Sequence, residues 1–383
     1  MKYSGLLFAN LFRKKIRLTL TIGSFAAALF LFTFLAVVKS AFSRGVEVAS
    51  ADRLDVINRT SIIQLLPIAY RDKMLTIPGI KAITHDNWFG GIYQDEKNFF
   101  PQFAIDIENQ RQVFPEMVLP DDQWQAFLKD RQGAIAGART AKRFGWKIGD
   151  RIPLKTSFYG WPSSWEFNLH GIYHNTRPGG DESQFWLQYK YFDETMPADQ
   201  KGLAGWYVIR LDNPDDAARV ARTVDTMFAN STYETKTETE SAFAAGWVKQ
   251  FGNIEFLILT IGSVVFFTLL LVTGNTMAIA VRERTAELAV LKAVGFSDRA
   301  VLLMVLAESI LISVIGGGLG LLFAALAVPV IASALNGLLP DLVVSYVTLL
   351  AGVGFALGVG ALSGLVPAIG AMRLRVVDAL RRV

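Results

Sequence analysis

Four long windows with almost no charge dominate this sequence of 383 residues. They cover residues 18–38, 256–281, 300–340 and 342–372, and Glu308 is the one charged residue inside them. An α-helix needs about 20 mostly apolar residues to cross a bilayer. Each window reaches that length, so the chain is predicted to cross a membrane four times.

The distribution of Lys and Arg orients these spans. One set of span ends is basic: Lys2, Arg13, Lys14, Lys15 and Arg17 before the first span, Arg282, Arg284, Lys292 and Arg299 between the second and third, and Arg373, Arg375, Arg381 and Arg382 after the fourth. The connection at residues 334–344 has no Lys or Arg. Because basic loops stay in the cytoplasm, both termini and the polar segment after the second span are predicted to be cytoplasmic. This ordinary membrane-protein pattern does not indicate a nucleic-acid partner.

We therefore expect a membrane α-helical protein of four transmembrane helices, with a large mixed α/β extracytoplasmic domain inserted between helices 1 and 2. The expected segments are a cytoplasmic amphipathic segment (1–17), transmembrane helix 1 (18–39), the extracytoplasmic domain (40–237, β-rich at about 131–191), a stalk plus transmembrane helix 2 (238–281), a cytoplasmic coupling helix (282–299), transmembrane helix 3 (300–333), a short outer loop (334–344), transmembrane helix 4 (345–372) and a cytoplasmic tail (373–383). The alternative for the first window is a cleaved signal peptide. That window is too long for one, and no clear small-x-small cleavage site follows it.

Strands and helices alternate within the insert. Residues 165–173 alternate apolar and polar side chains, which predicts a half-buried strand. A strand at 205–211, a helix at 215–230 and a strand at 232–237 form a βαβ-like unit. From residue 238 one helix is predicted to run into the second span. The chain has no Cys, so neither disulfides nor cysteine metal sites contribute.

The polar segment between the second and third spans has a helical pattern of its own. Leu288, Leu291 and Val294 share one stripe, Gly295 stands where a helix C-cap belongs, and Ser297 can cap the next helix. A short amphipathic helix at the membrane surface is therefore predicted.

Four motifs resemble the MacB/FtsX-type ABC transporter permeases, of the four-span DevC-like layout without a fused ATPase domain. They are NLFRKKIRLTLT at residues 10–21, GAIAGARTAKRFGWKIGDRIPL at 133–154, RERTAELAVLKAVG at 282–295 and PAIGAMRLRVVDALR at 367–381. Many relatives carry a proline near Val376 or Val377, where this chain has none.

The resemblance implies a non-catalytic permease subunit that acts by mechanotransmission, most often in export. Its implied partners are a cytoplasmic ABC ATPase subunit that binds ATP and Mg, a second permease copy (homodimer or paralogous heterodimer), a periplasmic adaptor and an outer-membrane channel, in the bacterial inner membrane. The sequence contains no GxxxxGK[ST] loop, so we expect the ATPase to be a separate polypeptide. Alternatives are a lipoprotein-releasing LolC/LolE-like permease and an FtsX-like regulator of an extracytoplasmic hydrolase. A membrane-anchored enzyme or receptor would leave the four-motif pattern unexplained.

The resemblance also assigns the ATPase-docking coupling helix. Its candidate residues are Arg282, Glu283, Arg284, Glu287, Leu288, Leu291, Lys292, Ala293 and Gly295. Leu288, Leu291 and Val294 would fill a cleft on the ATPase while the charges set the register. The plain alternative is a solvated helix face at a membrane surface.

Two kinds of residue stand out inside the spans. Glu308 is an intramembrane acid, and such residues are functional candidates by default. Pairing with a basic residue such as Arg13 or Arg17 is favoured over a proton relay, because the spans contain no second acid. Glycines at GxxxG spacing permit close helix packing, within the subunit or between copies: Gly316, Gly320, Gly354, Gly358, Gly360 and Gly364.

No catalytic, cofactor-binding or metal-ligating residues are expected. His170 and His174 would share one face of a strand at about 13 Å, too far apart to ligate one ion. The aromatic loop at residues 158–165 fits either a core or an exposed patch that meets an adaptor or a lipid-like cargo.

Overall fold

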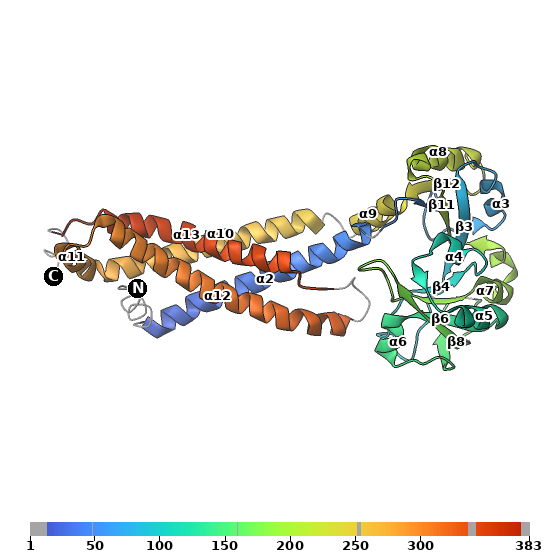
Figure 1. The fold of residues 1–383 in the computed structure, drawn as a ribbon, viewed down its shortest axis with the longest axis horizontal. Helices are drawn as coiled ribbons and strands as arrows, with labels where there is room; N and C mark the ends of the chain where they lie inside the picture. The colour runs from blue at the N-terminus through green and yellow to red at the C-terminus, as the bar shows by residue number, and fades with distance from the viewer. Residues whose placement is uncertain (1–13, 48, 159, 251–253, 336–341, 377–383) are drawn as a thin grey trace. The chain divides into compact units, whose positions relative to one another are not determined.

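The computed structural model describes residues 14–47, 49–158, 160–250, 254–335 and 342–376 (Figure 1). The chain divides into two compact units. One is helical and contains Met1–Ala41, Asn253–Ala334 and Asp341–Val383; the other contains Phe42–Gly252 and Leu335–Pro340.

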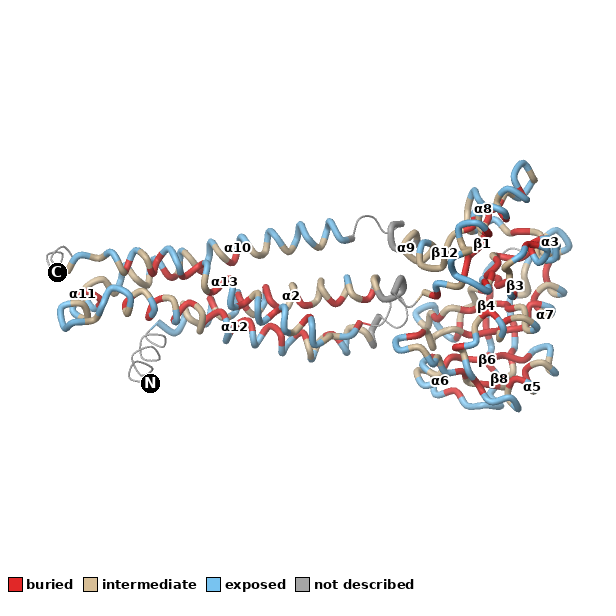
Figure 2. Tube along the Cα trace, turned by 45° about the horizontal axis from the view of Figure 1, so that its top comes forward, coloured by how far each residue is buried: buried red, intermediate tan, exposed pale blue. Residues whose placement is uncertain are grey.

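In its described residues, the helical unit is a bundle of four long helices and one short one. They are α2 (Lys15–Glu47), α10 (Ile254–Glu283), α11 (Thr285–Ala293), α12 (Asp298–Leu335) and α13 (Tyr346–Met372). The four long helices each contain a span apolar enough to cross a membrane. Much of each long helix is exposed (Figure 2). The exposed residues include large apolar ones such as Leu271 at 74% and Val347 at 76%. Apolar side chains that face outward favour contact with lipid, because the outer surface of a helix bundle in water would be mostly polar.

The second unit is a mixed α/β domain. Its strands are β1 (Arg53–Asn58), β2 (Leu66–Pro67), β3 (Ile80–Trp88), β4 (Gln102–Ile105), β5 (Met117–Val118), β6 (Gly133–Gly137), β7 (Arg151–Lys155), β8 (Ser164–Asn175), β9 (Phe185–Gln188), β10 (Leu203–Ala204), β11 (Trp206–Leu211) and β12 (Thr235–Thr239). Its helices are α3 (Tyr70–Met74), α4 (Gln110–Val113), α5 (Asp121–Lys129), α6 (Ala138–Phe144), α7 (Tyr189–Thr195), α8 (Ala217–Met227) and α9 (Glu240–Gln250). Together with the bundle, this domain confirms the predicted fold class.

One ten-stranded sheet runs through the domain in the order β12-β1-β11-β3-β4-β9-β6-β8-β5, with β7 paired to β8. β2 and β10 form a separate pair. Both β11 and β12 run antiparallel to β1, so they are parallel to each other with β1 between them. The βαβ-like unit is therefore confirmed as a split one, and its last strand occupies Thr235–Thr239 rather than 232–237.

Alternation decides which side chains of β8 enter the core. Trp165, Phe167 and Leu169 are at most 2% exposed, whereas Glu166 between them is exposed. The buried set joins Ala104 of β4 and aromatic side chains from β9 and α7 in one large apolar cluster of the domain. The predicted strand at 165–173 is thereby confirmed.

The predicted stalk has two described parts. α9 ends at Gln250 and α10 begins at Ile254. The join between them, at residues 251–253, lies outside the described residues.

Candidate functional site

The predicted coupling helix at residues 282–299 corresponds to α11, which covers Thr285–Ala293 because α10 continues to Glu283 and α12 begins at Asp298. Arg284 leaves helical geometry (φ −106°, ψ 16°) and separates α10 from α11. At the other end Gly295 has φ 105°, its N–H donates to the Lys292 carbonyl, and the Phe296 N–H donates to the Leu291 carbonyl. These are the two bonds of a Schellman cap, which favours glycine because an L side chain would be strained there. Ser297 then accepts a bond from the Ala300 N–H and caps α12. The predicted caps at Gly295 and Ser297 both agree with these contacts.

Glu308 pairs with Arg284, and not with Arg17 as predicted. Nη1 of Arg284 lies 2.9 Å from Oε1 of Glu308, and Nη2 lies 3.1 Å from Oε2. The two side chains are 13% and 8% exposed. Arg13, the other predicted partner, lies outside the described residues. Pairing with a basic residue therefore agrees with the prediction, but the partner comes from the turn before α11 and not from the residues before the first span.

Lys292 anchors the other end of α11 to α13. Its Nζ donates to the carbonyl oxygens of Met372 (2.5 Å) and Leu374 (3.0 Å) and pairs with Asp298 at 2.7 Å. The Lys292 side chain is 7% exposed. A cation at the last carbonyls of a helix is favourable because those groups are otherwise unpaired and carry partial negative charge. Lys292 is thus an internal tie between helices.

Leu288 and Leu291 of the predicted apolar stripe face the bundle, whereas Val294, its third residue, is exposed. Leu288 is 3% exposed and packs in one cluster with Val301 and Ala368, and Leu291 packs against the same cluster. The expectation that Leu288 and Leu291 fill a cleft on a partner is therefore wrong. A surface helix buries its apolar face against whatever is nearest, and here that is the end of its own bundle.

The opposite side of α11 carries the exposed residues. Val290 is 51% exposed, Val294 is 76% exposed, and Glu287 lies one turn before Val290 on the same side. We call Glu287, Val290 and Val294 the outer face of α11. The remaining exposed candidates are Arg282, Glu283, Ala293 and Gly295. Val290 was missed by sequence reasoning, although its spacing of three from Glu287 and four from Val294 could have identified it.

Glu283 joins the start of α2 to the end of α10. Its carboxylate accepts from Lys14 Nζ at 2.6 Å and from Arg17 Nη2 at 2.7 Å. Together with the bonds of Arg284 and Lys292, this means that the ends of α2, α10, α12 and α13 are linked by charged contacts around α11.

The glycines differ in what they face. β-carbons added at Gly316 and Gly320 would collide with α2, at Phe25 and Ala26 respectively. Those added at Gly360 and Gly364 would meet Ser313 and Ser309 of α12. The predicted packing within the subunit is therefore confirmed for these four positions. A β-carbon at Gly354 or Gly358 would meet no atom within 4 Å among the described residues.

Within the α/β domain, a buried arginine joins the segment that follows α2 to the helix that precedes α10. Arg53 of β1 is 3% exposed; its Nε lies 2.7 Å from Oε2 of Glu240, and its Nη1 lies 2.6 Å from Oε1 of Glu116. The backbone N–H of Ser50 donates to the same Glu240 at 2.7 Å. Burial alone would lower the pKa of Arg53, but Glu240 and Glu116 raise it above its ordinary value. We call Ser50, Arg53, Glu116 and Glu240 the Arg53 clamp.

Comparison with known proteins places the bundle in a family. Residues 259–376 match the FtsX-like permease C-terminal family. The chain carries an FtsX-like permease domain. This domain contains α11, α12, α13 and most of α10, so the resemblance to MacB/FtsX-type permeases is confirmed and the chain is a membrane protein.

Two curated relatives align with part of the permease chain. An uncharacterized ABC transporter permease, YvrN of Bacillus subtilis strain 168, is 37% identical over 110 residues, which are 28% of this chain and 25% of the relative. The macrolide export ATP-binding/permease protein MacB of Bdellovibrio bacteriovorus is 37% identical over 107 residues, 28% of this chain and 16% of the relative. The aligned part is thus a quarter or less of either relative.

Solved structures resemble the other unit. The extracellular domain of the noncanonic ABC-type transporter YknZ from Gram-positive bacteria covers 49% of this chain, with 100% of its own length aligned, 9% identity and a TM-score of 0.35. The periplasmic region of MacB from Actinobacillus actinomycetemcomitans covers 53%, with 94% of its own length aligned, 11% identity and a TM-score of 0.37.

The remaining residues singled out in the sequence lie in the α/β domain. His170 and His174 both lie on β8. Nε2 of His170 lies 2.8 Å from Oδ2 of Asp130, and Nδ1 of His174 lies 3.4 Å from Oε1 of Glu182. Among the described residues, no group of three His, Cys, Asp or Glu side chains could hold a metal ion. In the aromatic loop Trp165 is core and Trp161 packs against that core, whereas Phe158 is 48% exposed. The loop therefore contributes one buried side chain, Trp165, and one partly buried side chain, Trp161, to the core, while Gly160, Ser163 and Ser164 are exposed; Tyr159 lies outside the described residues.

Proposed function

We propose that this chain is the non-catalytic membrane subunit of an ABC transporter of the MacB/FtsX type. A separate cytoplasmic ATPase, which binds ATP and Mg, contacts the outer face of α11. The observation that carries this proposal is the division of α11 into two sides. One side is tied to α12 and α13 by Arg284 and Lys292, and the other leaves Val290 and Val294 exposed.

That division suits a helix that transmits force. A partner that pushes on the outer face moves a helix whose inner face is already fastened to the bundle. Exposed apolar side chains flanked by charge are typical of a docking surface, where the apolar residues supply binding energy and the charges set the register. The basic span ends support a cytoplasmic location for α11 and an extracytoplasmic location for the α/β domain, in a bacterial inner membrane.

The Arg53 clamp supports mechanotransmission to the α/β domain. Ser50 follows α2 and Glu240 begins α9, so the two connections between the domain and the spans meet at one buried arginine. We infer that motion of the helices reaches the domain through this point. Export of a periplasmic or outer-leaflet substrate, with an adaptor protein, an outer-membrane channel and a second permease copy, is the activity that we assign to the assembly.

The test is purification of the tagged chain with the products of its neighbouring genes. An ABC ATPase should copurify, and Val290→Asp should reduce both its recovery and its stimulated ATP hydrolysis at least about tenfold, as expected for a buried interface residue worth more than 1.4 kcal/mol. Val118→Asp, at a 45% exposed valine of the α/β domain, is the matched control and should leave both unchanged. An assembly that never contains an ATPase would remove the proposal.

A further inference from the structure

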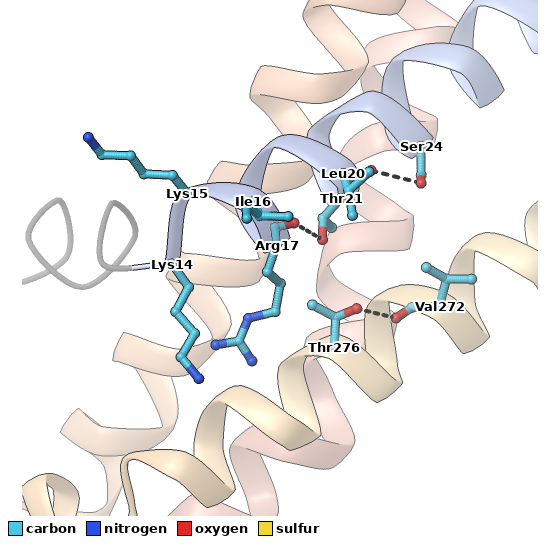
Figure 3. A pocket seen from close by; sticks show the side chains of 9 residues that line it. All are labelled: Lys14, Lys15, Ile16, Arg17, Leu20, Thr21, Ser24, Val272 and Thr276. Carbon is cyan, nitrogen blue, oxygen red and sulfur yellow. Dashed lines mark hydrogen bonds between the residues drawn. The ribbon is translucent and has the colours of Figure 1, made fainter.

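A groove opens between the start of α2 and the last third of α10 (Figure 3). Its volume is about 800 Å³. The groove is lined by Lys14, Lys15, Ile16, Arg17, Leu20, Thr21, Ser24, Val272 and Thr276. We call it the α2–α10 groove. It lies within the helical unit, at the end of the bundle where α11 is found.

The groove has an apolar wall and a basic mouth. Ile16, Leu20 and Val272 supply apolar surface. The hydroxyls of Thr21, Ser24 and Thr276 donate to carbonyls one turn earlier in their own helices, so they require no partner from outside (Figure 3). An acyl chain can therefore lie along this wall without leaving a hydroxyl donor unpaired.

The mouth carries more positive than negative charge. A second cavity of about 360 Å³ shares Lys14, Arg17, Thr21 and Thr276 with the groove, and it adds Glu283, Arg284 and Glu308. Glu308 is bound by Arg284, and Glu283 is shared by Lys14 and Arg17. Lys15 makes no ion pair with any residue in the part of the chain that the structure describes. Lys14, Arg17 and Arg284 thus lie around two carboxylates, and Lys15, whose side chain points away from α10 at the rim of the groove (Figure 3), brings the excess to two positive charges.

The groove also lies at the depth of a lipid headgroup. It begins where the basic residues of α2 give way to the apolar window at Leu18. Lys and Arg at such a boundary extend toward the headgroups while their stems stay in the apolar region. Basic pockets between transmembrane helices, on this kind of boundary, suit anionic headgroups.

We propose that the α2–α10 groove binds one anionic phospholipid from the leaflet at the α11 end of the bundle. Its phosphate would lie among Lys14, Lys15 and Arg17, and one acyl chain would follow Leu20 and Val272. Such a lipid bridges α2 to α10, the helix that leads directly into α11. The proposal rests on insertion in a membrane and does not depend on the ATPase.

The experiment is native mass spectrometry of the full chain released from micelles that contain phosphatidylglycerol or phosphatidylcholine with identical acyl chains. One phosphatidylglycerol should be retained per chain, in preference to phosphatidylcholine. Lys15→Gln and Arg17→Gln should each lower retention about fivefold, the value expected for one basic residue at an anionic membrane. Arg299→Gln, which removes the same charge at the same end of the bundle but does not line the groove, is the matched control.

A second pair of variants tests the apolar wall. Ser24→Trp fills the groove and should abolish retention, whereas Ser263→Trp, at an exposed serine of α10 outside the groove, should not. Glycerol 3-phosphate, which lacks acyl chains, should not displace the lipid. Equal retention of the two lipids, equal loss in Arg299→Gln, displacement by glycerol 3-phosphate, or a change of oligomeric state in Ser24→Trp without loss of lipid would each overturn the proposal.

Discussion

The guanidinium of Arg284 donates two hydrogen bonds to the carboxylate of Glu308, at 2.9 and 3.1 Å. Arg284 stands in the turn before α11, and Glu308 lies about three turns into α12. Bidentate geometry fixes the relative orientation of both groups as well as their distance. This pair therefore sets the angle at which α11 leaves α10.

Replacing one partner of this pair should lower the stability of the bundle more than replacing both. Glu308→Gln leaves Arg284 charged and half-enclosed, and breaking such a pair costs about 3–5 kcal/mol. Because the chain has no Cys, Ala368→Cys in the bundle core reports on opening of the bundle through its rate of thiol labelling. The midpoint of labelling with temperature should fall in Glu308→Gln and recover in part in Glu308→Gln/Arg284→Gln. Strictly additive losses would show that the two side chains do not interact.

Gly320 should tolerate no side chain, and Gly354 should tolerate one. A β-carbon at Gly320 collides with the Ala26 carbonyl oxygen of α2, whereas one at Gly354 meets nothing within 4 Å in the described part of the chain. Overpacking of this kind costs about 1–3 kcal/mol. Gly320→Ala should lower the same labelling midpoint, and Gly354→Ala should leave it unchanged. The opposite order would mean that α2 does not pack on α12 as described.

The Arg53 clamp should be a major source of stability in the α/β domain. All eight tryptophans of the chain lie between Trp88 and Trp247, so tryptophan fluorescence reports on this unit alone. Arg53→Met leaves Glu116 buried without its partner, and we expect a loss of about 3 kcal/mol in urea unfolding. Arg59→Met is the matched control. It breaks the exposed pair with Glu234 and should cost less than about 1 kcal/mol. Similar losses of stability in the two variants would show that the buried Arg53 clamp stabilises the domain no more than an exposed ion pair does.

The stability of the α/β domain should fall between pH 6.5 and pH 8. Burial raises the pKa of Asp86 to about 8, so the folded state holds a proton that the unfolded state releases near its ordinary value. The folded state then binds more protons across this range, and stability decreases as pH rises. Burial lowers the pKa of His85 to about 4, which makes stability rise with pH from about 4 to 6.5 and offsets Asp86 there. Above pH 6.5 Asp86 acts in the same direction as Asp55, whose pKa burial also raises well above its ordinary value.

Asp86→Asn tests this assignment. Urea unfolding followed by tryptophan fluorescence should give a fall of about 2 kcal/mol between pH 6.5 and 8 in the parent chain, at up to about 1.4 kcal/mol per pH unit. The variant should give a shallower slope, to which Asp55 still contributes. Asp122→Asn, at an exposed carboxylate of α5, should keep the slope of the parent. An unchanged slope in Asp86→Asn would assign the proton to another group.

The spans and several strands could be predicted because each depends on a pattern within its own segment of the sequence. A bilayer demands a certain apolar length, and a half-buried strand such as β8 demands alternation. β1 was not predicted, because its burial depends on partners in other segments of the chain. Arg53, Asp55 and Asn58 are all buried in it, and the partners of Arg53, at Glu116 and Glu240, lie far along the chain.

The orientation of α11 at the candidate site also could not be predicted from its own segment of the sequence. Periodicity identifies Leu288 and Leu291 as a stripe that must be buried, but it does not say against what. Sequence reasoning assigned that stripe to a partner, whereas the end of the bundle covers it. The face left for a partner could be located only after the contacts of Arg284, Leu288 and Lys292 were known.

Site-specific photocrosslinking at Val290 tests the central claim most directly. A photoreactive amino acid at Val290, in the chain expressed with its neighbouring genes, should form a covalent adduct with an ABC ATPase. The same amino acid at Leu350, an equally outward position that is 73% exposed on α13, should give no ATPase adduct. An ATPase adduct at Leu350 and none at Val290 would contradict the account of α11 as the docking helix.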